Sequence, residues 1–210
     1  MKKGIILFDI DKTIFNTESM SKEINRKIVE LLHHPDHKLI LEAKDQYKNT
    51  LTNERYFVPE DYIKILCEKI NFNNKKSLED IYYDQKYAYI YKENVYEETF
   101  ETIDKLKNSY QLGIFSEGTS RFQNNKFYSM NLDKYFNKDL IFIVNEKDTK
   151  EAVGKIPKNS IIVDDKESIC DFLIENNINC IWLNRKDKRK SDKHKTIFSL
   201  LELPAILKLS

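Results

Sequence analysis

Short apolar runs constrain the fold of this sequence more than any other feature. Each run is continuous rather than alternating, which is typical of a strand whose two faces are both buried. The runs are GIILFDI (residues 4–10), QLGIFS (111–116), LIFIVN (140–145), SIIVDD (160–165) and CIWLN (180–184). Helical patterns lie between these runs, at residues 97–107 before the second run, 120–130 after it and 166–176 after the fourth. We therefore predict an α/β fold with a parallel sheet of about five strands flanked by helices.

Residues 17–96 show a different pattern, in which strand signals are weak. Ile24, Ile28 and Leu31 recur at helical spacing, and a second apolar stripe runs through residues 62–70. We interpret this stretch as a helical domain inserted between the first two strands. The predicted domains are a core, made of residues 1–16 and 97–210, and an insertion, made of residues 17–96.

The composition excludes several classes of protein. The 35 basic side chains nearly balance the 34 acidic ones, which argues against a broad surface for nucleic acid or anionic membranes. No apolar stretch approaches the roughly 20 residues that span a bilayer, and Asp9 and Asp11 interrupt the one segment that starts like a secretory signal. Cys67, Cys170 and Cys180 lie among apolar neighbours, as buried thiols do in a reducing compartment. We expect a cytoplasmic protein.

Two segments of unusual composition could bind a ligand, although both favour structural roles. The tyrosine-rich residues 82–91 could stack on a nucleobase or other ring, but packing between helices is the favoured interpretation. The basic residues 184–195 could attract a phosphate, but we interpret them as a solvated connection. The chain is expected to end in a helix over residues 196–209, interrupted at Pro204.

Polar residues follow four of the predicted strands at the point where each strand ends. They are Asp9 and Asp11 after the first, Ser116 after the second, Lys147 after the third, and Asp164 and Asp165 after the fourth. The carboxyl ends of neighbouring parallel strands converge on one crevice, where ligands bind. We therefore expect these side chains to lie close together.

Such a cluster suits phosphoryl transfer. Several carboxylates beside one lysine need a hard cation, and Mg²⁺ prefers oxygen ligands while keeping waters for a substrate phosphate. One carboxylate can accept a phosphoryl group as an aspartyl-phosphate, and a second can protonate the leaving oxygen and activate water. Asp9 and Asp11 point to the same side of an extended segment, which suits these two roles. The alternative is a solvated turn, with Asp164 and Asp165 as helix caps.

The ordered set of motifs resembles the haloacid dehalogenase (HAD) superfamily of phosphohydrolases. FDIDKT (8–13) is similar to the first motif of that family, IFSEG (114–118) to the second, Lys147 to the third, and VDD (163–165) to the fourth. The resemblance implies a HAD-like Rossmannoid fold. It also implies that the helical insertion is a cap of the C1 type, as in subfamily I.

The resemblance also implies a role for each residue. Asp9 would be the nucleophile and a metal ligand, and Asp11 the general acid and base with its carbonyl on the metal. Asp165 would bind Mg²⁺ directly, and Asp164 would either bind it through water or contact the direct ligands. The phosphate-binding residues would be Ser116, Lys147, Thr13, Glu117 and Gly118. Lys150 is the alternative to Lys147, which is preferred because it follows its strand more directly.

The expected activity is Mg²⁺-dependent hydrolysis of a small phosphorylated metabolite, with no nucleic acid or membrane as partner. Nucleotides, phosphoglycolate and sugar phosphates all stay open as substrates. A phosphomutase could use the same nucleophile. A phosphoryl-accepting switch or phosphate-binding module could use similar residues, although the acid at Asp11 and the large insertion favour an enzyme.

Overall fold

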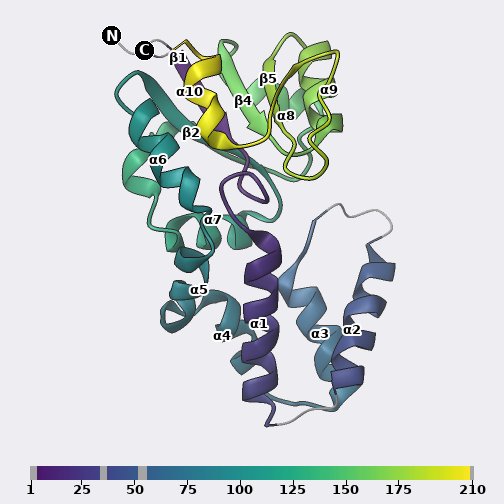
Figure 1. Ribbon diagram of the computed structural model, residues 1–210. Helices are drawn as coiled ribbons and strands as arrows, with labels where there is room; N and C mark the ends of the chain where they lie inside the picture. Colours follow the sequence, from purple (N-terminus) through teal and green to yellow (C-terminus); the bar gives the residue numbers. More distant parts are fainter. Residues whose placement is uncertain (1–3, 34–36, 52–55, 209–210) are drawn as a thin grey trace. The chain divides into compact units, whose positions relative to one another are not determined.

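The computed structural model describes residues 4–33, 37–51 and 56–208 (Figure 1). The described chain divides into two compact units. Unit 1 lies within Met1–Asn16, Val95–Glu117 and Asn131–Ser210, and unit 2 lies within Thr17–Asn94 and Gly118–Met130. The predicted division into a core (1–16 and 97–210) and an insertion (17–96) stays a prediction.

Unit 1 contains a six-stranded sheet, in which every neighbouring pair of strands is parallel. The strand order is β3-β2-β1-β4-β5-β6. The strands are β1 (Gly4–Phe8), β2 (Tyr110–Glu117), β3 (Ile141–Val144), β4 (Ser160–Asp164), β5 (Asn179–Leu183) and β6 (Lys195–Ile197). Figure 1 shows β1, β2, β4 and β5 running together through this unit. The predicted α/β class and parallel sheet are confirmed.

The end of the chain differs from the prediction. In place of a solvated loop running into a closing helix, β6 pairs with β5 and adds a sixth strand. A short 3₁₀ helix η4 (Leu200–Glu202) and α10 (Leu203–Ile206) follow it. Only one of the three residues of β6, Ile197, is buried, so the strand has no apolar run to reveal it. Ser199 then caps η4 in a capping box with Glu202, which stops the strand.

Helices flank the sheet of unit 1. They are α6 (Glu97–Leu106), α8 (Lys150–Lys155), α9 (Glu167–Glu175) and α10, together with the 3₁₀ helices η2 (Asp133–Tyr135), η3 (Lys138–Leu140) and η4. Consecutive residues of β1 are buried on opposite sides, as with Ile6 and Leu7, because a parallel sheet is covered on both faces. That double burial explains the continuous apolar runs of the sequence.

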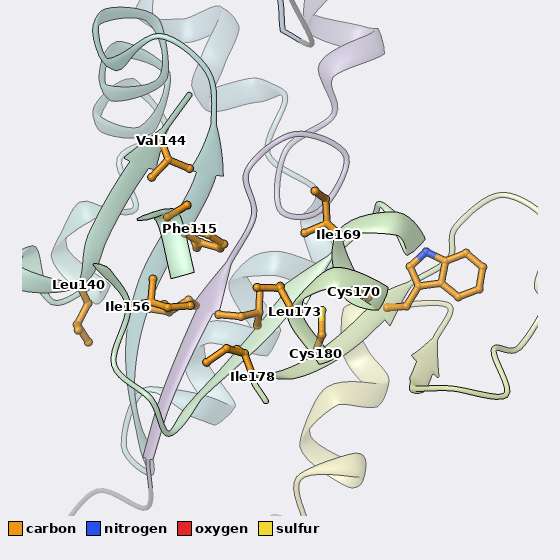
Figure 2. Packing of buried hydrophobic residues seen from close by; sticks show 13 residues of the cluster. Phe115, Leu140, Val144, Ile156, Ile169, Cys170, Leu173, Ile178 and Cys180 are labelled. Atoms are coloured by element: carbon orange, nitrogen blue, oxygen red, sulfur yellow. The ribbon is translucent and has the colours of Figure 1, made fainter. Parts of the chain in front are cut away.

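One core of unit 1 forms where α8 and α9 pack on the sheet. Figure 2 shows Phe115 of β2, Leu173 of α9 and Ile156 just after α8 pointing into the same region. Ile178 and Cys180 belong to the same core. Burying each of these larger apolar side chains contributes about 1.5–3 kcal/mol. This core therefore stabilises the strands whose ends carry the polar residues.

The secondary-structure elements of unit 2, among its described residues, are all helices. Its helices are α1 (Thr17–Leu31), α2 (His37–Thr50), α3 (Pro59–Ile70), α4 (Lys75–Tyr83), η1 (Gln85–Tyr87), α5 (Ala88–Glu93) and α7 (Ser120–Ser129). The helices α1 to α5 confirm the predicted helical insertion between the first and second strands, whereas α7 follows β2 and lies outside that insertion. Tyr82 and Tyr91 of the tyrosine-rich segment are buried, and the Tyr91 hydroxyl donates to the Tyr82 carbonyl at 2.7 Å. Within the described chain, none of the helices has the length and apolar character to cross a membrane.

The chain leaves and re-enters unit 1 at neighbouring points. Phe15 and Val95 form an antiparallel bridge. The amide of Tyr96 donates to the Ile14 carbonyl at 3.1 Å, and the Thr99 hydroxyl donates to the same carbonyl at 3.1 Å. Thr99 is on the first turn of α6, so this helix fixes both ends of the intervening segment.

Candidate active site

The segment after β1 leaves the strand and folds back in a tight loop. The amide of Asp9 still donates to the Val163 carbonyl at 2.9 Å, so Asp9 remains in register with β4. The carbonyl of Ile10 then accepts from the amide of Phe15 at 3.1 Å, and the amide of Lys12 donates to the Phe15 carbonyl at 2.8 Å. Lys12 has a φ of +60°, a left-handed conformation that lets the chain reverse. We call residues 10–15 the reversal loop.

Four side chains meet at the carboxyl ends of four strands. The Lys147 ammonium donates to Asp9 Oδ1 at 2.5 Å and to Asp164 Oδ2 at 2.6 Å. The Ser116 hydroxyl donates to the same Asp9 oxygen at 3.1 Å. The Lys147 side chain is only 2% exposed, and the other three residues are also buried. The first, second and fourth strands and the loop after the third thus bring their terminal polar groups to one place.

Glu117, the last residue of β2, forms hydrogen bonds with residues of this cluster. Its buried carboxylate accepts from the Lys147 amide at 3.2 Å and from the Lys166 ammonium at 3.0 Å. The Lys166 amide in turn donates to Asp164 Oδ1 at 2.8 Å. Glu117 was expected to bind phosphate. Its carboxylate accepts from the Lys147 amide and the Lys166 ammonium, and a phosphate contact from Glu117 stays a prediction.

The carboxylates of the cluster are crowded. Burial raises the pKa of Asp9 to about 7; the Lys147 ammonium opposes this shift, and the charges of Asp164, Asp165 and Asp11 add to it. Burial also raises the pKa of Asp165 to about 6, and the charge of Asp164 adds to the shift. For Lys147, burial lowers the pKa, but Asp164 and Asp9 outweigh it and keep the ammonium charged. One buried lysine therefore leaves negative charge uncompensated.

Among the described residues, one group of acidic side chains could hold a metal ion. Asp9, Asp164 and Asp165 each offer a carboxylate oxygen, and these oxygens lie within 4.8 Å of one another. An all-oxygen set with surplus negative charge suits a hard cation such as Mg²⁺. The half-buried Asp11 side chain lies outside this group; the contribution expected from Asp11 was its main-chain carbonyl.

The remaining predicted residues differ in their surroundings. Thr13 is fully buried, and its hydroxyl has no hydrogen-bond partner among the described residues. Gly118 has a φ of +143°, and a Cβ there would lie 2.8 Å from the side chain of Gln123, so this turn requires glycine. Lys150, the alternative to Lys147, is exposed at the first residue of α8.

Two basic residues near the cluster were missed. Lys166 contacts Glu117, as described above. Arg185, expected in a solvated connection, instead donates to the carbonyls of Lys12 and Thr13 in the reversal loop. That expectation is wrong for Arg185, because two main-chain acceptors hold its side chain. A signal was present, since Arg185 follows the fifth strand just as the other site residues follow theirs.

Comparison with known proteins adds family information to this geometry. The family model described as haloacid dehalogenase-like hydrolase matches residues 6–162. No curated protein matches the sequence.

Several solved structures share the fold. The HAD-hydrolase YfnB from Bacillus subtilis, bound to magnesium, is 20% identical with a TM-score of 0.68, and the match covers 100% of each chain. A HAD phosphatase from Thermococcus onnurineus is 22% identical with a TM-score of 0.63, covering 99% of this chain and 98% of that one. L-2-haloacid dehalogenase from Xanthobacter autotrophicus is 12% identical with a TM-score of 0.63, covering 100% of each. At these identities the likeness establishes the fold, and it includes both phosphatase and dehalogenase structures.

Proposed function

Because this chain belongs to the haloacid dehalogenase-like hydrolases, we propose that it is a Mg²⁺-dependent phosphomonoester hydrolase that acts through an aspartyl-phosphate on a small phosphorylated metabolite. The observation that carries the proposal is the buried contact of one Asp9 oxygen with the Lys147 ammonium and the Ser116 hydroxyl. These donors lie where the oxygens of a phosphoryl group on Asp9 would need stabilisation.

The proposed reaction has two displacements. A carboxylate oxygen of Asp9 attacks phosphorus, the bond from phosphorus to the substrate oxygen breaks, and Asp11 gives its proton to the leaving alcohol. A water molecule then attacks the phosphorus of the aspartyl-phosphate, the bond from phosphorus to the Asp9 oxygen breaks, Asp11 takes a proton from this water, and inorganic phosphate leaves. Throughout, Lys147 and Ser116 donate to the transferring group.

The carboxylates of Asp9 and Asp165 would hold Mg²⁺ directly, with Asp164 bound through water. When bound, the cation withdraws charge from the phosphoryl oxygens. The contacts of Asp164 support this order, because Lys147 bonds to one of its oxygens and the Lys166 amide to the other. The geometry also favours Lys147 over the exposed Lys150 as the phosphate-binding lysine.

The chemistry of the leaving group favours a phosphatase over a dehalogenase. A departing halide is a weak base and needs no proton, whereas the alkoxide of a phosphomonoester is a strong base that needs one. Asp11 is an acid two residues from the nucleophile, and its charge is close enough to raise the pKa of Asp9. Asp11 therefore has a role in phosphoryl transfer that halide displacement does not require.

A cytoplasmic location belongs to the same proposal. None of the three cysteines forms a disulfide, and Cys170 and Cys180 are buried. Contact with the Cys180 thiol, together with burial, raises the pKa of Cys170, which makes this thiol unreactive. Buried thiols of this kind are compatible with a reducing compartment.

Turnover of p-nitrophenyl phosphate by the purified chain tests the proposal. We expect multiple turnovers with Mg²⁺, none in EDTA, and none with Asp9→Asn. A screen of phosphorylated metabolites for phosphate release then identifies the substrate class. Isomerised sugar phosphate without phosphate release would instead indicate a phosphomutase, and one stable acyl-phosphate per chain would indicate a switch. Wild-type turnover by Asp9→Asn would refute Asp9 as the nucleophile.

A further inference from the structure

The guanidinium of Arg185 holds the main chain next to Asp11. Arg185 lies two residues beyond the end of β5. Its Nε donates to the Lys12 carbonyl at 3.0 Å, and its Nη2 donates to the Thr13 carbonyl at 2.8 Å. Lys12 and Thr13 are the two residues that follow Asp11 along the chain. The Arg185 side chain therefore binds the reversal loop immediately after the proposed acid.

Arg185 bonds to two carbonyls that the internal hydrogen bonds of the reversal loop do not use. These internal hydrogen bonds converge on two other carbonyls: that of Ile10 accepts from the amides of Thr13, Ile14 and Phe15, and that of Phe15 accepts from the amide of Lys12. The carbonyls of Lys12 and Thr13 are outside this pattern, and both accept from the Arg185 guanidinium. A planar guanidinium can bridge two adjacent carbonyls, whereas an ammonium presents a single point charge. Arg185 therefore sets the orientation of two successive peptide planes.

Arg185 is itself held on two further sides. Its Nη1 pairs with Glu98 at 2.5 Å, and its guanidinium carbon lies 4.1 Å from the centre of the Tyr96 ring. Glu98 also accepts from the Ser199 hydroxyl and from the Leu200 amide. Although burial raises the pKa of Glu98, the hydrogen bonds from Ser199 and Arg185 keep it below its usual value, so the pair stays charged. The side chain of Arg185 is only 22% exposed.

We propose that Arg185 is a positioning residue, which fixes the peptide planes after Asp11 and thereby the direction in which Asp11 presents its carboxyl group. The kinetic consequence rests on the proposed function, whereas the fixing of the reversal loop does not. Misplacement of a reacting group by about 1 Å can cost about a hundredfold in rate. The effect of losing Arg185 should therefore fall on kcat.

The test compares Arg185→Lys with Arg189→Lys. Arg189 lies in the same charged segment, but its guanidinium pairs with Glu167 and its side chain is 54% exposed. With p-nitrophenyl phosphate and saturating Mg²⁺, we expect kcat of Arg185→Lys to fall about 10- to 100-fold while KM changes less than about threefold. Arg189→Lys should retain wild-type values. A purely structural role would lower the unfolding temperature and leave kcat of the folded enzyme unchanged.

Amide hydrogen exchange of residues 12–15 provides the second measurement. We expect faster exchange in Arg185→Lys than in wild type and in Arg189→Lys, while the β4 amides keep their protection. If the wild-type protein hydrolyses no phosphomonoester, the proposed function fails, and the exchange result alone decides whether Arg185 holds the loop. Unchanged exchange in Arg185→Lys, or a kcat within twofold of that of Arg189→Lys in an active enzyme, overturns the inference.

Discussion

Replacing the proposed nucleophile with its uncharged isostere should stabilise the metal-free protein. In the folded state burial raises the pKa of Asp9 from an ordinary value of 3.8 to about 7. The folded protein therefore holds a proton that the unfolded chain has already lost between these two pH values. Ionising the buried Asp9 lowers the unfolding free energy, and this penalty is absent below about pH 4, where Asp9 is protonated in both states. The penalty grows as the pH rises and is complete just above pH 7, where Asp9 ionises in both states.

The size of this penalty follows from the shift. Each pKa unit corresponds to about 1.4 kcal/mol, so a shift of roughly three units corresponds to about 4 kcal/mol at pH 8. Asp9→Asn removes the ionisable group, while Lys147 keeps its 2.6 Å contact with Asp164. We expect Asp9→Asn in EDTA to unfold at a higher temperature than wild type at pH 8, by roughly 8–16 °C for a domain of this size. The advantage should shrink steadily towards pH 4.

Thermal unfolding followed by circular dichroism at pH 8, 6 and 4 measures this difference. Saturating Mg²⁺ should stabilise wild type more than Asp9→Asn, because the variant has lost one proposed ligand. The reasoning is refuted if Asp9→Asn in EDTA is less stable than wild type at pH 8. It is equally refuted if the difference between the two proteins does not change with pH.

Three further predictions concern catalysis, the buried lysine and packing. Asp11→Asn should lower kcat about 10²- to 10⁴-fold without changing the circular dichroism spectrum, and full activity would overturn its role as proton carrier. Lys147→Met should cost about 3–5 kcal/mol of unfolding free energy, because it leaves buried carboxylates without their partner. Lys150→Met, at an exposed position, should stay within about 0.5 kcal/mol of wild type. Equal urea midpoints for the two variants would contradict this prediction. Gly113→Ala places a Cβ 2.4 Å from the Leu140 carbonyl oxygen and should destabilise the sheet by more than about 1–3 kcal/mol. The added Cβ of Gly154→Ala, in α8, meets no atom within 4 Å, and this variant should stabilise the protein by up to about 1 kcal/mol. Denaturant unfolding of the two glycine variants checks the last pair, and a similar effect in both would show that the close approach at Gly113 is unimportant.

The sequence predicts the central sheet well because burial on both faces leaves a continuous apolar run. It also predicts that Asp9, Ser116, Lys147 and Asp164 should meet, because parallel strands bring their carboxyl ends to one edge. The structure brings these four side chains together. Their chemical roles remain proposals.

Other features leave no such pattern. The strand β6 has a single buried residue, so its pairing with β5 depends on tertiary contacts alone. Arg185 follows the fifth strand, but its partners are main-chain carbonyls, which every residue possesses, and no side-chain spacing could reveal them. Glu117 is placed by its own strand, but its partners are a main-chain amide and the side chain of Lys166. Contacts with main-chain groups of this kind form only in the folded chain and cannot be predicted from the sequence pattern.

The bridge between Phe15 and Val95 has a consequence for how this chain tolerates length changes. Closing a flexible segment as long as Thr17–Asn94 costs about 4 kcal/mol of chain entropy, and doubling its length adds only about 0.6 kcal/mol. Unit 1 joins the two ends of this segment with its own hydrogen bonds, through Ile14, Tyr96 and Thr99. Insertions and deletions between the two ends therefore change the closure entropy little, and the sheet that carries the site can keep its stability while the helical segment varies in size.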